Sequence, residues 1–285
     1  ISTWQSLYKM PQEYFEQYDV IVGDECHQFK AKSLTSIMTK LVNAKYRFGT
    51  TGTLDGTQTH ELVLQGLFGK IYNVTTTKKL QDNDTLAKLN INVLLLRYPE
   101  SVRKEFGKRE YHDELDFIVK HEGRNKLIKN LALDLKGNTL VLFQYVEKHG
   151  KPLFELIRDG AVKERKIFYV SGQVESSDRE VIRQIVETQK NSIIVASLGT
   201  FSTGINIRNL HNIIFASPSK SQVRVLQSIG RSLRKSDDGS DATLYDIADD
   251  LHWKSRENFT LTHSAERIKI YAKEQFNYDI HEVKI

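Results

Sequence analysis

The feature that most constrains this fold is the alternation of short apolar runs with longer amphipathic stretches. Runs rich in β-branched and aromatic residues predict strands, and stretches with apolar residues at helical spacing predict helices. Parallel strands cannot be joined by a tight turn, so they need a crossover of a dozen or more residues, which is usually a helix. We therefore expect an α/β protein built on doubly wound parallel sheets.

The first half of the chain contains few predicted strands. They cover residues 19–23, 46–50 and 90–98, with a helix over residues 31–42 between the first two. A doubly wound sheet continues to edge strands on both sides, and such strands are missing from this half. We therefore expect a first sheet that is incomplete at its N-terminal side.

The second half contains about five predicted strands, enough for a complete doubly wound sheet. Helices are expected over residues 152–160, 177–188 and 222–234, followed by a final helix over 253–276 and a short strand over 278–285. The five strands are predicted at residues 139–145, 166–170, 192–196, 212–216 and 242–247.

A charged stretch separates the two halves. The sequence VRKEFGKREYHDE, residues 102–114, has no clear apolar period and predicts a linker. We therefore expect a first domain over residues 1–101, a charged linker over 102–125, a second domain over 126–250 and a helical C-terminal extension over 251–285.

The composition excludes several classes of protein. The longest apolar runs are far shorter than the roughly 20 residues of a membrane-spanning helix. Cys26 is the one cysteine, which excludes an internal disulfide and fits a reducing compartment. The formal net charge of +5 permits a polyanionic partner. The chain has no signal peptide and no initiator methionine, so we expect a cytoplasmic protein of which this chain is a part.

Two adjacent carboxylates, Asp24 and Glu25, follow the first strand in the sequence IVGDECHQF. Ligands of open parallel sheets bind at the carboxyl ends of the strands. Mg²⁺ on a nucleotide favours one or two carboxylates, and the second carboxylate can then deprotonate an attacking water. An acidic loop is the simpler alternative. A zinc site at Cys26 and His27 lacks the usual ligand spacing.

A second cluster is the sequence QSIGRSLR on the helix predicted over residues 222–234. Gln227, Arg231 and Arg234 are spaced i, i+4 and i+7, so they share one face and can clamp a polyanion. Gly230 within the helix costs about 1 kcal/mol, which favours a close approach over the alternative of a solvated basic face.

Three further segments are rich in small polar residues. SLGTFSTGIN, residues 197–206, follows a predicted strand and can present backbone N–H groups and hydroxyls to phosphates. TGT (51–53) and STWQSL (2–7) are common polar turns when each is taken alone.

In this order the segments resemble the motifs of superfamily 2 helicases, over most of residues 1–250. The resemblance implies two RecA-like doubly wound lobes, the first incomplete at its N-terminus. Thr51-Gly52-Thr53 has glycine where the family usually has alanine, and Asn206 stands where aspartate is frequent. The matching segments are STWQSL (motif Ib), DECH at 24–27 (motif II), TGT (motif III), LVLFQY at 140–145 (motif IV), SLGTFSTGIN (motif V) and QSIGRSLR (motif VI).

The resemblance also implies roles for single residues. Asp24 would hold the Mg²⁺ of ATP, Glu25 would activate the hydrolytic water, and Arg231 and Arg234 would reach the γ-phosphate. The remaining positions carried over are His27 and Gln227, which would couple the lobes across the nucleotide, Gly204 and Asn206 beside the nucleotide, and Thr3, Gly172 and Ser197 beside the nucleic-acid backbone.

The function implied by the resemblance is an ATP- and Mg²⁺-dependent DNA helicase. Its substrates would be branched or duplex DNA or DNA–RNA hybrids, remodelled by fork regression, branch migration of Holliday junctions or R-loop unwinding. We expect a monomer that serves recombination, repair and replication, without a membrane or disulfide partner.

The sequence contains no GxxxxGK[ST] loop, which in this family precedes motif II and cradles the phosphates. We therefore expect the chain alone to be inactive and its parent protein to hydrolyse ATP. A hydrolysis-deficient nucleic-acid-binding module is the alternative. A metabolic enzyme would show GxGxxG after the first strand, and none is present.

Overall fold

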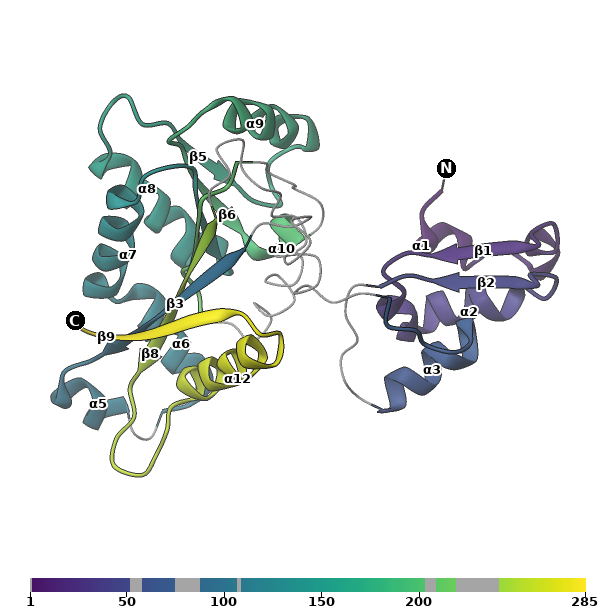
Figure 1. The fold of residues 1–285 in the computed structure, drawn as a ribbon, viewed down its shortest axis with the longest axis horizontal. Coiled ribbons are helices and arrows are strands. Elements are labelled where there is room, and N and C mark those ends of the chain that lie inside the picture. Colours follow the sequence, from purple (N-terminus) through teal and green to yellow (C-terminus); the bar gives the residue numbers. More distant parts are fainter. Residues whose placement is uncertain (1, 52–57, 75–87, 107–108, 203–208, 219–240) are drawn as a thin grey trace. The chain divides into compact units, whose positions relative to one another are not determined.

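A computed structural model describes residues 2–51, 58–74, 88–106, 109–202, 209–218 and 241–285 of the chain (Figure 1). The chain divides into two compact units, Ile1–Val74 and Thr75–Ile285. Each unit contains a parallel sheet with helices. The expected α/β class with doubly wound parallel topology is therefore confirmed.

The first unit contains two parallel strands, β1 (Val20–Gly23) and β2 (Tyr46–Gly49). They match the predicted strands, and the helix expected between them is α2. The helical elements of this unit are α1 (Trp4–Leu7), the 3₁₀ helices η1 (Gln12–Phe15) and η2 (Cys26–Lys30), α2 (Lys32–Lys40) and α3 (Gln58–Phe68).

The two faces of the β1–β2 sheet differ. Ile21 packs against a small core that includes Phe15 and Met38. On the other face, Val22 and Phe48 lie opposite each other and are 65% and 56% exposed. Within the described residues, this unit therefore buries only one face of its sheet.

The second unit contains a seven-stranded parallel sheet with the order β5-β6-β4-β7-β8-β3-β9. Every strand predicted in the second half is present. The strands are β3 (Leu89–Arg97), β4 (Thr139–Phe143), β5 (Ile167–Val170), β6 (Ile193–Ser197), β7 (Asn212–Phe215), β8 (Ala242–Asp250) and β9 (Asn277–Lys284).

Helices cover both faces of this sheet, because the central strands are apolar on both sides. In β4, Leu140 and Leu142 enter one core, while Val141 and Phe143 enter the other, as the period of two along a strand requires. The helical elements are α5 (Glu100–Phe106), α6 (Tyr111–Lys120), α7 (Glu122–Asp134), the π-helix η3 (Val146–Gly150), α8 (Lys151–Gly160), α9 (Ser176–Thr188), α10 (Leu198–Ser202) and α12 (Phe259–Lys273).

The strand over residues 89–97 lies in a different sheet from the one we expected. Instead of extending the first sheet, β3 pairs in parallel with β8 on one side and β9 on the other. Figure 1 shows β3 between these two strands. The division of the chain accordingly falls near residue 74 and not at the expected boundary of residue 101.

The segment expected as a linker, residues 102–125, is largely helical and packed. It contains most of α5, all of α6 and the start of α7. Leu115, Ile118 and Val119 of α6 are fully or almost fully buried. The apolar period begins at Leu115, directly after the charged stretch, so the charge pattern concealed a core helix.

The C-terminal extension contains the predicted helix, α12, and the predicted strand, β9. Because β9 pairs with β3, the extension completes the sheet and is not purely helical. Glu114 of α6 fixes the start of α12, since its Oε1 accepts from the backbone N–H of Thr260 at 2.8 Å and its Oε2 from that of Phe259 at 3.0 Å. A carboxylate at a helix N-terminus is favourable.

Candidate functional site

Asp24 follows β1 at the carboxyl end of the first sheet. Its Oδ1 accepts hydrogen bonds from the Thr50 hydroxyl, at the end of β2, and from the Glu25 backbone N–H, both at 2.9 Å. Both of these bonds reach Oδ1, and the residue is exposed. A carboxylate held through one oxygen on an exposed residue fits the single protein ligand that nucleotide-bound Mg²⁺ commonly takes.

Glu25 adopts the left-handed backbone conformation, with φ 48° and ψ 45°. This conformation costs a non-glycine residue about 1–2 kcal/mol and therefore needs support from its surroundings. Cys26, the next residue, supplies part of this support, because its backbone N–H donates a hydrogen bond to the Thr50 carbonyl at 2.9 Å. The Glu25 side chain is 56% exposed, which leaves its carboxylate accessible.

His27 connects the two sequence motifs of this unit. Its Nδ1 lies 2.9 Å from the Thr51 hydroxyl and 3.2 Å from Oε2 of Glu25. The structure therefore brings Glu25, His27 and the start of the TGT segment together. Gly52 and Thr53 lie outside the described residues.

Two glycines allow α3 to cover the ends of both strands. A Cβ at Gly23 would lie 2.8 Å from Cζ of Phe68, and a Cβ at Gly49 would lie 2.9 Å from its Cγ. Cys26 is buried at the same place, and burial together with the nearby negative charge of Glu25 raises the pKa of its thiol. No group of three or more histidine, cysteine or acidic residues suited to a metal ion occurs in the part of the chain that the structure describes.

Two nucleic-acid-contacting residues predicted in the second unit lie near each other. Ser197 ends β6 and is largely buried, with its Oγ 2.7 Å from the Thr200 hydroxyl. Gly172 is exposed after β5, and a Cβ there would lie 3.9 Å from the same hydroxyl. Gly172 and Ser197 thus flank Thr200 at the carboxyl edge of the sheet.

Thr3 has a local structural role in the first unit. It is the N-cap of α1, and its hydroxyl accepts from the Ser6 N–H at 3.3 Å. Such a cap satisfies a donor that a helix start otherwise leaves without a partner. Thr3 is exposed, so it is also accessible to a ligand.

Five predicted site residues lie outside the described residues, and their roles stay predictions. They are Gly204, Asn206, Gln227, Arg231 and Arg234.

The end of β8 carries a second acidic cluster that the sequence reasoning missed. Asp246 accepts from Nε and Nη2 of Arg267 at 2.9 and 2.8 Å, and Asp249 accepts from Nε and Nη2 of Arg124 at 2.8 and 3.1 Å. All four side chains are almost completely buried. These pairs hold α12 and α7 to the sheet. The signal for them was the sequence DIADD, which places Asp246 within a predicted strand and Asp249 just after it.

His149, in the π-helix after β4, is also fully buried. Its Nδ1 lies 3.1 Å from the Ser217 hydroxyl. Burial, followed by the positive charge of Arg124, lowers the pKa of His149 from 6.5 to about 3. The imidazole is therefore neutral at physiological pH.

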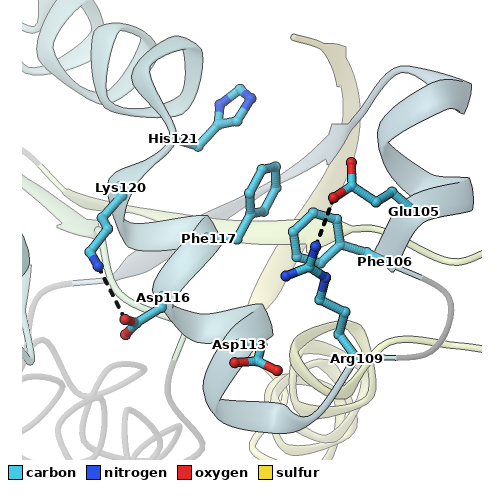
Figure 2. Close-up of a pocket in the computed structure, with 8 residues that line it drawn as sticks. All are labelled: Glu105, Phe106, Arg109, Asp113, Asp116, Phe117, Lys120 and His121. Carbon is cyan, nitrogen blue, oxygen red and sulfur yellow. Dashed lines mark hydrogen bonds and ion pairs between the residues drawn. The ribbon is translucent and has the colours of Figure 1, made fainter.

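A pocket of about 480 Å³ is lined by residues of α5, α6 and the segments next to them, which Figure 2 draws as sticks. Phe106 and Phe117 form part of its wall, with ring centroids 4.0 Å apart. Arg109 pairs with Glu105 at 2.7 Å, and an ion pair of α6, between Lys120 and Asp116, lies at the same cavity. None of the predicted site residues lines this cavity.

Comparisons with known proteins match both units. Residues 122–236 match the helicase conserved C-terminal domain, and residues 1–56 match the type III restriction enzyme res subunit family. Over 291 aligned residues, the chain is 37% identical to the ATP-dependent DNA helicase UvsW of Enterobacteria phage T4, covering 98% of this chain and 57% of that protein. The crystal structure of T4 UvsW superposes with a TM-score of 0.61 over 99% of this chain and 57% of that chain.

More distant structures share the fold. An ATP-dependent type ISP restriction-modification enzyme, LlaBIII bound to DNA, has a TM-score of 0.67 at 16% identity, covering 99% of this chain and 23% of that one. Dbp5 of S. cerevisiae, bound to RNA and ADP BeF3, has a TM-score of 0.53 at 11% identity, covering 100% of this chain and 65% of that one.

The chain thus spans little more than half the length of UvsW. No helix of the described segments is long and apolar enough to cross a bilayer. The two family matches fall on the two units in the order that the sequence motifs predicted. With 37% identity to UvsW along almost all of its length and a helicase conserved C-terminal domain matched over residues 122–236, the chain is similar to the superfamily 2 helicases.

Proposed function

We propose that the protein carrying this chain is an ATP-dependent DNA helicase whose first unit holds the hydrolytic carboxylates. The observation that carries this proposal is the geometry after β1. Asp24 is fixed through one oxygen, and Glu25 is exposed on a strained backbone beside it. Strained residues persist at functional sites where the surrounding structure holds them. UvsW, at 37% identity, is an ATP-dependent DNA helicase.

The residues of the first unit divide the chemistry between them. Asp24 would hold a nucleotide-bound Mg²⁺, which offsets negative charge on the phosphates when bound. Glu25 would accept the proton of the attacking water. His27, 3.2 Å from Glu25 Oε2, would orient that carboxylate and connect it to Thr51.

The second unit would supply positive charge and nucleic-acid contacts. Arg231 and Arg234 would stabilise the charge that develops on the γ-phosphate, as arginine fingers do in phosphoryl transfer. Gln227, His27, Gly204 and Asn206 complete the proposed nucleotide contacts.

Nucleic acid would be bound through its sugar-phosphate backbone. Thr3 and Gly172 are exposed, and Ser197 ends β6 with its hydroxyl on Thr200. Hydroxyls and backbone N–H groups at these positions would contact phosphates, and such contacts carry little sequence information. The substrates proposed are branched or duplex DNA and DNA–RNA hybrids, remodelled by a monomer in the cytoplasm through fork regression, branch migration or R-loop unwinding.

ATP hydrolysis tests this proposal. We would compare this chain with one extended upstream by a phosphate-binding loop, each with and without branched DNA. We expect DNA-stimulated turnover only in the extended protein, and a loss of 10³-fold or more in Arg234→Ala. Arg158→Ala, at an exposed arginine of α8, is the matched control and should keep its activity.

Absence of turnover from both wild-type proteins would contradict the proposal. DNA binding that persists without turnover would favour the alternative of a hydrolysis-deficient nucleic-acid-binding module.

A further inference from the structure

We propose that His60 is a positioning residue that holds the DECH turn, residues 24–27, in its strained conformation. His60 lies in the first turn of α3 and is 4% exposed. Its Nε2 lies 2.9 Å from the backbone carbonyl oxygen of His27. A carbonyl oxygen only accepts, so Nε2 carries the proton and donates it. The inference rests on the proposed function in one respect, that this turn carries the hydrolytic carboxylates.

The turn needs such a contact because its backbone is strained at Glu25. Two bonds between backbone groups already tie it to β2, from the Cys26 N–H to the Thr50 carbonyl and from the Thr50 N–H to the Gly23 carbonyl, both at 2.9 Å. His60 adds a bond from a different element, α3, to the carbonyl of His27, which lies in the 3₁₀ helix η2. His27 is therefore held at both ends, its ring by Thr51 and its carbonyl by His60.

The far end of α3 also contacts this region, in a different way. The ring of Phe68 meets that of Phe29 edge-on, with centroids 5.2 Å apart, and covers Gly23 and Gly49. Packing of this kind excludes water but does not fix the direction of a carbonyl group. A buried donor does fix it, because hydrogen bonds weaken steeply when they are misaligned. His60 thus sets the orientation of a turn whose position Phe68 sets by packing.

Cys26 provides a direct readout, because it is the single cysteine of the sequence and lies within the turn. We would measure the rate of thiol modification by a disulfide reagent in the native chain, together with the melting temperature. The variants are His60→Ala, His60→Gln, which keeps a donor near the position of Nε2, and Gln65→Ala, at an exposed site of the same helix.

We expect His60→Ala to raise the modification rate about tenfold, the scale of one buried hydrogen bond. His60→Gln should return the rate to within about twofold of the wild type, and Gln65→Ala should leave it unchanged. An unchanged rate in His60→Ala would overturn the proposal. Equal increases in His60→Ala and His60→Gln, with equally lowered melting temperatures, would also overturn it, because they would show that His60 only fills space.

A second measurement separates this inference from the proposed function. In the protein extended upstream, His60→Ala should lower kcat about tenfold with little change in the KM for ATP, since it displaces Glu25 and removes no phosphate contact. His60→Gln should restore kcat. If the wild-type protein has no turnover, the proposed function fails, and the thiol rates still decide whether His60 holds the turn.

Discussion

The ends of β1 and β8 carry similar residues in opposite surroundings. Both strands finish in acidic residues, Asp24 and Glu25 directly after β1 and Asp249 and Asp250 at the end of β8. After β1 the carboxylates are exposed, and Glu25 has a strained backbone. At β8 they are buried, and Arg124 forms two hydrogen bonds with Asp249.

The two strand ends differ in the side chains that neighbouring elements place beside the carboxylates. Helices α7 and α12 bring Arg124 and Arg267 to β8, so the charges there are matched within the fold. Among the described contacts after β1, Asp24 receives a hydroxyl and a backbone N–H, and neither carries a full positive charge. Acidic residues at a strand end therefore stabilise the fold where cations meet them, and remain available for a ligand where they do not.

The largest effect is expected at β8. Arg267→Met should destabilise the second unit by about 3–5 kcal/mol, because it leaves the buried carboxylate of Asp246 without its cation. Urea denaturation followed by circular dichroism measures the change. Arg183→Met, at an arginine of α9 that pairs with Glu180 on the surface, should cost less than about 1 kcal/mol. A similar cost for both variants would show that burial of the Arg267–Asp246 pair adds nothing to its effect on stability.

A smaller effect concerns His149, the buried histidine of η3 in the second unit. His149 has a pKa of about 3 in the fold against 6.5 when unfolded, so below pH 6.5 the unfolded chain binds the proton first. The free energy of unfolding is therefore unaffected by His149 above pH 6.5. It decreases as the pH falls, by about 2 kcal/mol between pH 6.5 and 5.

Urea titrations at several pH values measure this slope. In His149→Gln we expect a weaker pH dependence than in the wild type. His281→Gln, on the exposed strand β9, should keep the wild-type slope. If the slope were the same in His149→Gln, the buried imidazole would not be its source.

The smallest effect is expected at β1. Glu25→Gly should be about 1 kcal/mol more stable than Glu25→Ala, because only alanine keeps a Cβ in the left-handed conformation. Thermal unfolding of the pair, which differs by a single methyl group, isolates the strain. Equal stabilities would mean that the backbone leaves this conformation once the glutamate is removed.

The strands could be predicted from local pattern, but the position of β3 could not. Its apolar run indicates a strand, whereas its neighbours are residues 242–250 and 277–284, far along the chain. The DECH turn was found because it belongs to an ordered series of motifs. His60 was missed because a single histidine on a helix has no pattern, and its role depends on a carbonyl group 33 positions away in the sequence.

The placement of β3 also has a mechanical consequence. β3 is bonded on both sides, to β8 and β9, and all three strands run parallel. A pull along β3 from its N-terminal end therefore loads two ladders of hydrogen bonds in shear, so the bonds must fail together and not one after another. Tension that enters the second unit through residue 88 is thus shared by three strands, and β9, at the edge of the sheet, helps to hold β3 in place.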